Sequence, residues 1–497
     1  MLIRADASVA IGTGHVMRCL ALAQAWQDMG GCALFVYAEM TPALEERLRK
    51  EGMEVARLEV SAGSAEDSDG TIATAKGRGV FCVVVDGYQF DAKFQRSIKD
   101  AGLKVLFVDD YGHADQYSAD FVLNQNVFAH ESAYKNREPY TQLLLGTRFA
   151  MLRREFASWG NWRRSFSDST RHVLVSIGGS DPANVTSQVL QAMAYCCGKD
   201  VEVGVIVGGS NPHAAEIRKA ADAASFPVQT ILGTSDMPRW LMWADVMISS
   251  SGSTCWESCF FGLPSILIDV AENQRLVAER LQELGAAIHL GSLSDVTEET
   301  MALSLDTLLS STVASVKMSN VGRQLVDGNG AARVATLLSS GMRLRRAEYS
   351  DARLLWEWAN DPDVRSSSFS SAHIEWDQHV DWFRKRLSDE STFMFVAIDG
   401  QGTPVGQVRF EADENCQARI DISIASEKRG RGLSSTLIEQ AVETVFGMDV
   451  VRVHAVVKSE NRASIRAFER AGFTKAGDSL VENYPVVHFQ IDKSRKS

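Results

Sequence analysis

A glycine-rich loop near the amino terminus leads into a helical pattern and carries a histidine that could act as a base. Gly12 and Gly14 permit a tight turn, and His15 follows at the expected start of the helix. The positive end of a helix dipole disfavours an imidazolium, so a histidine there can stay neutral and accept a proton near neutral pH. Arg18, one turn further on, projects near the same end. His15 could instead cap the helix or bind a phosphate, and the loop alone leaves these alternatives open.

Two loops in the middle third also combine glycines with the start of a helical pattern. The first lies in 176–186 (SIGGSDPANVT) and the second in 249–258 (SSSGSTCWES). Uncommitted N–H groups and the helix dipole favour a diphosphate at such positions. Glu257, one turn into the second helix, can accept hydrogen bonds from both hydroxyls of a ribose. The residues that these loops offer to a nucleotide are Gly178, Gly179, Ser180, Gly252, Ser253 and Thr254.

A third loop of this kind lies near the carboxyl terminus, at 429–433 (RGRGL), between a strand pattern at 418–425 and a helical pattern. Its glycines let the backbone approach a bound group closely, and the helix start adds donors, so a pyrophosphate is the expected guest. A plain strand–helix turn would explain the loop equally well. Downstream, a β-rich run precedes Asn461 and Ser464, whose i,i+3 spacing is typical of a helix cap.

Together these segments resemble the GNAT superfamily of acetyltransferases over about 343–490. In that family one motif, R/Q-x-x-G-x-G/A, binds the pyrophosphate of acetyl-CoA, and a second, N-x-x-S/A-x-x-x-F/Y, opens the helix beside the pantetheine. The resemblance implies an N-acetyltransferase that uses acetyl-CoA as co-substrate. The residues that it assigns to acetyl-CoA are Arg429, Gly430, Arg431, Gly432, Leu433, Ser434, Asn461, Ser464 and Phe468.

Acetyl transfer of this kind needs a neutral amine, a polarised carbonyl and a proton for the leaving thiolate. Many family members carry a tyrosine where this chain has Phe468, and a phenylalanine ring has no proton to donate. Either another group such as Tyr484 supplies the proton, or the thiolate leaves without direct help. Glu411 and Asp421 are candidate bases on central strands, or else solvated carboxylates of a strand face.

Tryptophans gather on the segments that we expect to form the acceptor side of this domain, near 358–370 and 379–387. They could stack on a flat group such as a nucleobase, or they could anchor the first two helices to the core. These residues are Trp356, Trp358, Trp376 and Trp382.

Strand and helix patterns alternate over the first 340 residues and must position the first three loops. Continuous apolar runs closed by polar residues are typical of parallel strands buried on both faces, so the succession predicts doubly wound sheets. A polar, tryptophan-containing segment at 157–170 divides it into domains 1–160 and 161–340, facing each other across a cleft. The strand candidates are 81–88, 104–111, 121–126, 172–179, 201–209, 245–252 and 264–271.

The pattern changes near residue 341, where helices come first and a β-meander follows. This order is typical of α+β structure and indicates a separate domain, 341–497. The chain of 497 residues is in any case too long for one core, since domains usually run to about 100–200 residues.

Composition excludes several classes of function. The formal charge of −12 disfavours nonspecific nucleic-acid binding, and no apolar run reaches the roughly 18 residues of a membrane span. The first residues lack the apolar segment of a signal peptide, and the eight cysteines show no CxxC pair or zinc-site spacing. We therefore expect a reduced, cytoplasmic protein without a metal, nucleic-acid partner or membrane contact; the sequence leaves its oligomeric state open.

The second domain resembles glycosyltransferases of the GT-B fold and the MurG type, a likeness that puts Gln274 beside Ser253, Thr254 and Glu257 at the nucleotide-binding positions. The amino-terminal motif R-A-D-A-S-x-x-I-G-x-G-H-x-M-R-C-L narrows the resemblance to the UDP-2,4-diacetamido-2,4,6-trideoxy-β-L-altropyranose hydrolases of pseudaminic acid biosynthesis. VVDGY (84–88), VDDY (108–111), GGSDP (178–182) and NQ (273–274) agree with that family over about 1–340. The predicted fold class is α/β, a GT-B-type pair of Rossmann-like domains followed by an α+β GNAT domain.

The resemblance implies hydrolysis of a UDP-sugar with inversion at the anomeric carbon, His15 activating water and Asn273 positioning the substrate. In that pathway a GNAT enzyme first acetylates the 4-amino group of the same UDP-sugar, so this chain would join consecutive steps. Two alternatives stay open: a glycosyltransferase that uses an acceptor other than water, or one half that serves as a non-catalytic binding module.

Overall fold

The computed structural model describes residues 1–8, 11–166, 171–197, 200–209, 211–339, 342–399, 402–430, 432–448 and 450–493. The chain forms two compact units, Met1–Ala335 and Thr336–Ser497. The first unit contains two sheets and the second contains one. The part of the first unit that carries the first sheet is called the first lobe, and the part that carries the second sheet is called the second lobe.

The first lobe contains a seven-stranded parallel sheet with the strand order β3-β2-β1-β4-β5-β6-β7. Nearly all residues of its central strands are buried, as the continuous apolar runs predicted. Its strands are β1 (Leu2–Ala5), β2 (Leu34–Tyr37), β3 (Glu54–Arg57), β4 (Cys82–Asp86), β5 (Lys104–Val108), β6 (Phe121–Asn124) and β7 (Gln142–Leu145). Its helices are α1 (Gly14–Asp28), α2 (Pro42–Lys50), α3 (Ala65–Gly77) and α4 (Ala92–Asp100).

Local sequence signals set the helix ends in this lobe. Asp91 caps α4 by accepting a hydrogen bond from the Phe94 N–H, and Ser64 caps α3 in the same way. Helix α2 begins with proline and ends in basic residues, which suits the two ends of the helix dipole.

The strand order reverses between β1 and β4, which are neighbours in the sheet but not in the sequence. Chain segments leave these two strands in opposite directions, so a crevice opens at their carboxyl ends, where open α/β sheets bind ligands. The loop 11–13 and α1 follow β1, and Asp86 is the last residue of β4. The topology therefore places the amino-terminal glycine loop and the end of β4 at one crevice.

The second lobe repeats this design with a six-stranded parallel sheet in the order β10-β9-β8-β11-β12-β13. Its reversal lies between β8 and β11, so the two glycine-containing loops of the middle third flank one crevice. Its strands are β8 (Arg171–Ser176), β9 (Val201–Val207), β10 (Val228–Leu232), β11 (Val246–Ser250), β12 (Ser265–Asp269) and β13 (Ile288–Ser292). Its helices are α6 (Val185–Cys196), α7 (Ala214–Asp222), α8 (Met237–Trp243), α9 (Thr254–Phe261), α10 (Glu272–Leu284), α11 (Glu298–Ser310) and α12 (Thr312–Leu325).

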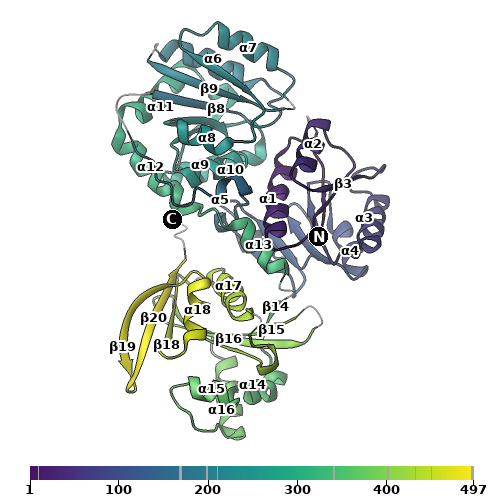
Figure 1. Ribbon diagram of the computed structural model, residues 1–497, viewed down its shortest axis with the longest axis vertical. Helices are drawn as coiled ribbons and strands as arrows, with labels where there is room; N and C mark the ends of the chain where they lie inside the picture. Colours follow the sequence, from purple (N-terminus) through teal and green to yellow (C-terminus); the bar gives the residue numbers. More distant parts are fainter. Residues whose placement is uncertain are drawn as a thin grey trace. The chain divides into compact units, whose positions relative to one another are not determined.

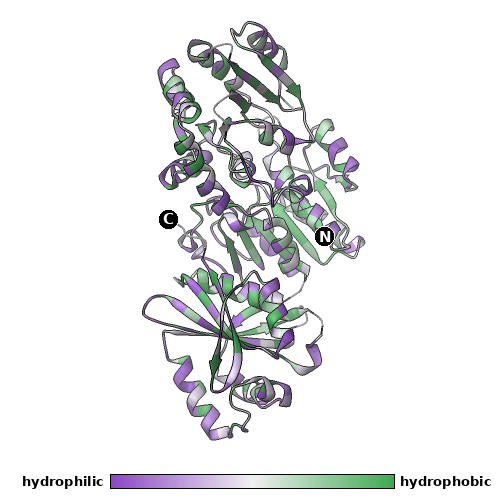
Figure 2. Ribbon diagram, turned by 60° about the vertical axis from the view of Figure 1, so that its left-hand side comes forward, coloured by the Kyte–Doolittle hydropathy of each residue, from purple (hydrophilic) through white to green (hydrophobic). Residues whose placement is uncertain are grey.

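Two short helices connect the lobes. α5 (Arg154–Ala157) follows the first sheet, and Phe156 from it packs in the core of the second lobe. α13 (Gly330–Ser339) returns to the first lobe, where the Arg333 guanidinium donates a hydrogen bond to the Arg148 carbonyl at 2.8 Å. Figure 1 shows the helices beside both sheets, and the colours of Figure 2 show that the strands are more hydrophobic than the helices.

The second unit is an antiparallel-rich sheet with the order β14-β15-β16-β17-β18-β20-β19 and helices on its faces. α17 and α18 pack on one apolar core, and α14 and α16 pack on another. Its strands are β14 (Arg343–Arg346), β15 (Thr392–Ile398), β16 (Pro404–Ala412), β17 (Gln417–Ile424), β18 (Arg452–Lys458), β19 (Thr474–Val481) and β20 (Tyr484–Asp492). Its helices are α14 (Ala352–Ala359), α15 (Pro362–Ser367), α16 (Trp376–Leu387), α17 (Leu433–Phe446) and α18 (Arg462–Arg470).

The predicted fold class, two Rossmann-like sheets followed by an α+β domain, is confirmed. One element differs from the predicted order, because the strand β14 precedes the first helix of the second unit. β14 is an edge strand that pairs only with β15, and its sequence RLRR is mostly polar. A strand with one neighbour needs no apolar run, so its sequence gave no signal. Among the described residues, no helix is long and apolar enough to span a membrane.

Candidate active sites

His15 lies in the first turn of α1 and contacts the carboxylate at the end of β4. Its Nδ1 lies 2.6 Å from Oδ1 of Asp86. Asp86 is fully buried, and His15 is 8% exposed. Thr13, at the start of α1, makes no side-chain cap. The structure therefore presents a nearly buried imidazole that is oriented by a buried carboxylate.

Arg18 forms ion pairs with two carboxylates. Its Nε and Nη2 donate to the two oxygens of Asp86 at 2.7 Å each, and its Nη1 donates to Asp110 Oδ1 at 2.7 Å. Asp110 follows β5 and also accepts a hydrogen bond from the Asn126 amide at 3.1 Å. Arg18 was predicted to contact the nucleotide sugar, but in this structure its guanidinium holds the chain's own carboxylates. Its contact with substrate stays a prediction.

Charge pairing decides the ionisation of this cluster. Burial by itself would raise the pKa of Asp86, but Arg18 and His15 hold that pKa well below its usual range. Burial also opposes ionisation of Asp110, and Arg18 again lowers the pKa. Both carboxylates are therefore ionised at neutral pH and surround the His15 ring with fixed negative charge.

Tyr88, two residues after β4, connects this cluster to the second lobe. Its hydroxyl donates to Asp110 Oδ2 at 2.7 Å and accepts a hydrogen bond from Asn273 Nδ2 at 2.8 Å. The Tyr88 ring also meets the His15 ring edge-on, with the centroids 5.0 Å apart. The structure thus brings together His15 and Asn273, the two predicted catalytic residues, although they contact each other only through Tyr88.

The glycine loops of the two lobes lie against each other. A Cβ built on Gly179 would lie 2.3 Å from the Thr13 hydroxyl, and one on Gly208 would lie 2.1 Å from the Gly179 carbonyl oxygen. Only residues without a side chain fit at these two positions. Gly178 has a φ of +92°, which favours glycine there for conformational reasons. The predicted loops therefore meet at one place in the first unit.

The helix starts of the second lobe differ in how open they are to an anion. Asp181 accepts hydrogen bonds from the N–H groups of Val185 and Thr186, at 2.8 and 3.0 Å, and so occupies the start of α6. Ser253 precedes α9 without making a side-chain cap. The dipole end of α9, beside Gly252, is therefore the more open position for a phosphate.

Gln274 and Glu257 flank this helix start. The Gln274 Oε1 atom is buried and has no hydrogen-bond partner in the described part of the chain, and the Gln274 Nε2 atom lies 3.7 Å from the Cβ position of Gly252. An unsatisfied buried acceptor is costly, so this oxygen suits a ligand hydroxyl. Glu257 is buried and forms an ion pair with Arg153 at 2.8 Å. Its predicted contact with a ribose stays a prediction.

The acetyl-CoA site predicted in the second unit lies where two neighbouring strands separate. β17 and β18 pair only from Gln417 with Arg452 to Arg419 with His454. Beyond these residues β17 continues to Ile424 beside β16, and β18 continues to Lys458 beside β20. The separating strands leave backbone groups of β17 that can pair with the amides of an extended ligand.

The RGRG loop follows β17 at this opening. Gly430 and Gly432 have φ values of +76° and +75°, and a Cβ on either would meet nothing within 4 Å. Gly432 directly precedes α17, so open N–H groups and a helix dipole converge there, which fits a pyrophosphate. Leu433 packs on the core, and Ser434 lies in the first turn of α17. Arg431 lies outside the described residues.

The remaining motif residues have defined structural roles. The Arg429 guanidinium donates to Asp361 and Asp363 at 2.7 Å each, so it holds the start of α15 rather than standing free. Asn461 caps α18 through the Ser464 N–H at 3.0 Å, the predicted geometry. Contact of these residues with acetyl-CoA stays a prediction.

Phe468 belongs to the hydrophobic core. It is 3% exposed and stacks on Phe489 with the centroids 6.0 Å apart. The candidate bases Glu411 and Asp421 both form ion pairs with Arg409, at 3.1 and 2.8 Å. Both are partly exposed, which agrees with the alternative interpretation as solvated carboxylates of a strand face, and their role as bases stays a prediction.

The tryptophans of the acceptor side contact one another and their own helices. Trp356 meets Trp376 edge-on at 5.7 Å and donates a hydrogen bond to the Ile374 carbonyl. Trp358 and Trp382 pack on the core beneath α14 and α16. These contacts favour the interpretation as core anchors.

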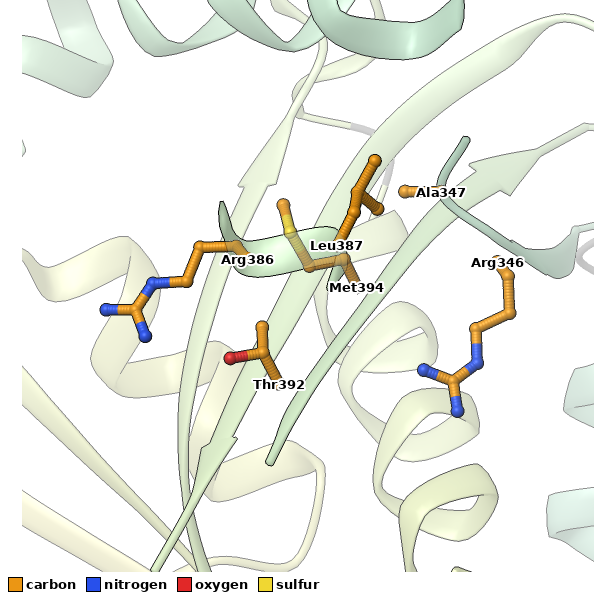
Figure 3. A pocket seen from close by; sticks show the side chains of 6 residues that line it. All are labelled: Arg346, Ala347, Arg386, Leu387, Thr392 and Met394. Carbon is orange, nitrogen blue, oxygen red and sulfur yellow. The ribbon is translucent and has the colours of Figure 1, made fainter. Parts of the chain in front are cut away.

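A cavity of about 250 Å³ lies beside β14 and β15, and no residue predicted to bind acetyl-CoA lines it. Figure 3 shows its two arginine head groups on opposite sides of Leu387 and Met394, so they do not converge on one ligand. Its lining residues are Arg346, Ala347, Arg386, Leu387, Thr392 and Met394. The described residues contain no group of three or more His, Cys, Asp or Glu that could hold a metal ion.

Sequence reasoning did not assign roles to Asp86, Tyr88 and Asp110. Each follows a buried strand at its carboxyl end, and that position was the available signal. Arg153, the ion-pair partner of Glu257, lies in the segment between the two sheets, so no strand end marked it as a candidate.

Comparisons with known proteins agree with this geometry. The glycosyltransferase family 28 C-terminal domain model matches residues 173–325, and the acetyltransferase (GNAT) domain model matches residues 342–474. The spore coat polysaccharide biosynthesis protein SpsG of Bacillus subtilis is 26% identical over 338 residues, which cover 67% of this chain and 96% of that protein.

Two further relatives match one part of the chain each. The UDP-2,4-diacetamido-2,4,6-trideoxy-beta-L-altropyranose hydrolase of Campylobacter jejuni is 23% identical over 287 residues, which cover 57% of this chain and 97% of that protein. The spermidine N(1)-acetyltransferase of Vibrio cholerae is 27% identical over 152 residues, which cover 30% of this chain and 86% of that protein. The chain therefore carries a GT-B-type region with a glycosyltransferase family 28 C-terminal domain, homologous to SpsG and to the altropyranose hydrolase, followed by a GNAT acetyltransferase domain.

Proposed function

We propose that this chain is a bifunctional enzyme of pseudaminic acid biosynthesis. Its GNAT domain transfers acetyl from acetyl-CoA to the 4-amino group of a UDP-4-amino-4,6-dideoxy-N-acetyl-altrosamine. Its GT-B part then hydrolyses the resulting UDP-2,4-diacetamido-2,4,6-trideoxy-β-L-altropyranose to UDP and free sugar with inversion. The named activity of the Campylobacter relative supports the choice of substrate for the second reaction.

The observation that carries the hydrolase proposal is the short contact between His15 Nδ1 and Asp86 Oδ1. An ionised carboxylate accepts a hydrogen bond from Nδ1–H, which leaves the lone pair on Nε2. Nε2 has no hydrogen-bond partner among the described residues, and the ring contacts Tyr88, which is hydrogen-bonded to Asn273 of the second lobe. A base oriented in this way can remove a proton from water.

The reaction follows from this arrangement. Water oxygen attacks the anomeric carbon while His15 Nε2 takes its proton, and the bond from that carbon to the phosphate oxygen breaks. A single displacement inverts the anomeric centre. Asp86 stabilises the imidazolium until the proton passes to solvent, as a carboxylate does beside a catalytic histidine. The start of α9 and Gly252 supply donors for the departing diphosphate, and no metal is required.

The acetyltransferase proposal rests on the opening between β17 and β18 and on the open loop at Gly430 and Gly432. The backbone of β17 would hold and polarise the thioester, and the start of α17 would hold the pyrophosphate. Acetylation must come first, because the hydrolase proposed here acts on the diacetamido sugar. The two units would thus perform consecutive steps on one substrate.

Mass-resolved products from the 4-amino UDP-sugar, with no acceptor added, test both halves. With acetyl-CoA we expect free CoA thiol, UDP and the diacetamido sugar, and without acetyl-CoA we expect little UDP. In ¹⁸O-labelled water the label should enter the sugar and not UDP, because water attacks carbon. UDP release that requires an added sugar acceptor would instead identify a glycosyltransferase.

The two halves are then separated with purified intermediate. The diacetamido UDP-sugar, supplied directly, should release UDP without acetyl-CoA. If it does so while no thiol ever forms from acetyl-CoA and the 4-amino sugar, the GNAT domain is a binding module and the bifunctional proposal fails.

A further inference from the structure

Lys458 is a buried lysine at the end of β18, where that strand has separated from β17. Lys458 is only 6% exposed, and its Nζ donates a hydrogen bond to the Ser366 carbonyl at 3.1 Å. The ammonium lies 3.9 Å from the centroid of the Tyr484 ring. Among the described residues, no carboxylate forms an ion pair with it. Burying an ammonium without a counterion is costly, so a position of this kind calls for a functional account.

Strand geometry places Lys458 on the acceptor side of the opening. Val457 lies in the core formed with α17 and α18, and successive strand residues point to opposite faces, so Lys458 faces the side of α14 and α15. If the pairing of Arg419 with His454 had continued, Lys458 would lie opposite Ser423. Lys458 therefore lies on β18 beyond its last pair with β17, on the face where its ammonium reaches α15.

The helix that carries the tyrosine of many family members offers no acid in this chain. Phe468 is enclosed between Phe473 and Phe489, with ring centroids 5.0 and 6.0 Å away. No rotation of Phe468 could supply a proton. A donor for the leaving thiolate would have to come from another element.

We propose that Lys458 donates the proton to the departing CoA thiolate, an inference that rests on the acetyl transfer proposed above. The amine nitrogen forms a bond to the acetyl carbon, and collapse of the adduct breaks the carbon–sulfur bond. The Lys458 ammonium gives a proton to sulfur and then takes the proton that the new amide nitrogen loses. Amine and acetyl-CoA thus become amide and CoA thiol, with Lys458 restored.

The same charge favours the reactive form of the acceptor. A cation close to the acceptor amine disfavours its ammonium form, so the neutral nucleophile is favoured. The ionisable groups on the surrounding elements are Asp363 and Arg365 on α15, Arg419 and Asp421 on β17, and Tyr484, His488 and Asp492 on β20. All three carboxylates are engaged, Asp363 with Arg429, Asp421 with Arg409 and Asp492 with Arg452, so none of them neutralises Lys458.

Lys458→Arg separates proton donation from the structural roles of the charge. Arginine keeps a cation beside the helix carbonyl and the aromatic ring, but it does not release a proton in proteins. We expect Lys458→Arg to retain CoA binding by calorimetry and the melting temperature within a few degrees. Its turnover, measured as thiol release, should fall about 10²-fold, within the range typical of general acid catalysis.

Two companion variants and a pH profile complete the test. Lys458→Met removes both charge and proton and should lose at least as much turnover as Lys458→Arg. Tyr484→Phe keeps the ring and should leave turnover within about threefold, since on this proposal its hydroxyl is not the donor. The pH profile of thiol release should differ between wild type and Lys458→Arg, since arginine cannot exchange the proton.

Wild-type turnover in Lys458→Arg would overturn the inference and make Lys458 a structural cap of α15. A large loss in Tyr484→Phe, with Lys458→Arg active, would make the tyrosine the donor. Absence of acetyl transfer in the wild-type protein would instead refute the proposed function of the domain.

Discussion

The site around His15 and the site at Gly432 are built from different parts of the polypeptide. In the first unit, ionised side chains from β4, β5 and α1 hold one another by hydrogen bonds of about 2.7 Å. In the second unit, the site consists of separating strands and a glycine loop in which added Cβ atoms would meet open space. The site around His15 is therefore a network of charged side chains, and the site at Gly432 is formed mainly by backbone groups.

The difference teaches how each site responds to change. A buried charge network depends on every member, because loss of one partner leaves another charge unpaired. A backbone site tolerates most side-chain changes but fails when a bulky group enters its space. Four predictions test this contrast, in order of decreasing effect.

Replacement of His15 should have the largest effect. His15→Ala should lower the turnover of UDP release about 10²- to 10⁴-fold, the range of general base catalysis, with UDP-sugar binding by calorimetry largely intact. His172→Ala, at the opposite end of the second-lobe sheet, is the control and should keep its turnover. Loss of binding with normal turnover at saturation would make His15 a binding residue instead.

Gly432→Trp tests the backbone site. The indole would enter the space beside the start of α17, so we expect at least about 10²-fold weaker CoA binding, corresponding to roughly 3 kcal/mol. Gly402→Trp is a matched control, since Gly402 also has a positive φ and open space around its Cβ position. Both variants carry the same backbone strain, so equal CoA binding in the two would contradict the assignment. UDP release from the diacetamido sugar should be unchanged in both.

Asp109, a buried carboxylate next to Asp110, accepts hydrogen bonds from Tyr117 and from backbone N–H groups, and its charge should make the first unit sensitive to acid. Burial alone would raise the pKa of Asp109, but His113, Tyr117 and backbone N–H groups lower it to about 2. A lowered pKa in the folded state means that the carboxylate stabilises the first unit above about pH 4. That contribution, on the order of 2 kcal/mol, is lost as the pH falls toward 2.

Asp109→Asn should therefore be less stable to urea than wild type at neutral pH, and the gap should shrink as the pH falls from 4 toward 2. Asp28→Asn, which alters an exposed ion pair with Arg154, should change stability by less than about 1 kcal/mol throughout. A gap for Asp109→Asn that stays constant with pH would show that its ionisation is not linked to folding.

The bond between Tyr88 and Asn273 should give the smallest effect. Tyr88→Phe removes the hydroxyl that joins the lobes and should lower kcat/KM for UDP release about fivefold, as a lost hydrogen bond of about 1 kcal/mol would. Asn273→Ala should cost a similar factor, and the double variant little more than either single one. Fully additive losses would mean that the two residues act independently.

Much of the fold could be predicted because its signals are local. Continuous apolar runs predicted the central strands β4, β5, β6 and β11, and the spacing of glycines predicted the loops at 12–14, 178–179 and 430–432. The edge strand β14 could not be predicted, since a strand with one neighbour needs no buried face.

Local sequence patterns could not predict which side chains would contact one another. Arg18 was predicted to contact the nucleotide sugar and Arg429 the acetyl-CoA, and nothing in the sequence indicated that aspartates from distant segments would pair with both. Lys458 belongs to no motif, and what sets it apart is its burial and the lack of an ion pair with any described carboxylate.

The sequence by itself determined the order of domains, the buried strands and the loops where backbone meets a ligand. These features depend on residue type and spacing along a few consecutive positions. Only the tertiary structure decided which charges face which, because Asp86, Asp110 and Arg18 are 24 to 92 residues apart and meet only when β1 and β4 pair in the sheet. Long-range pairing of ionised groups follows from topology, and topology is what brings the base, its carboxylate and the second lobe to one crevice.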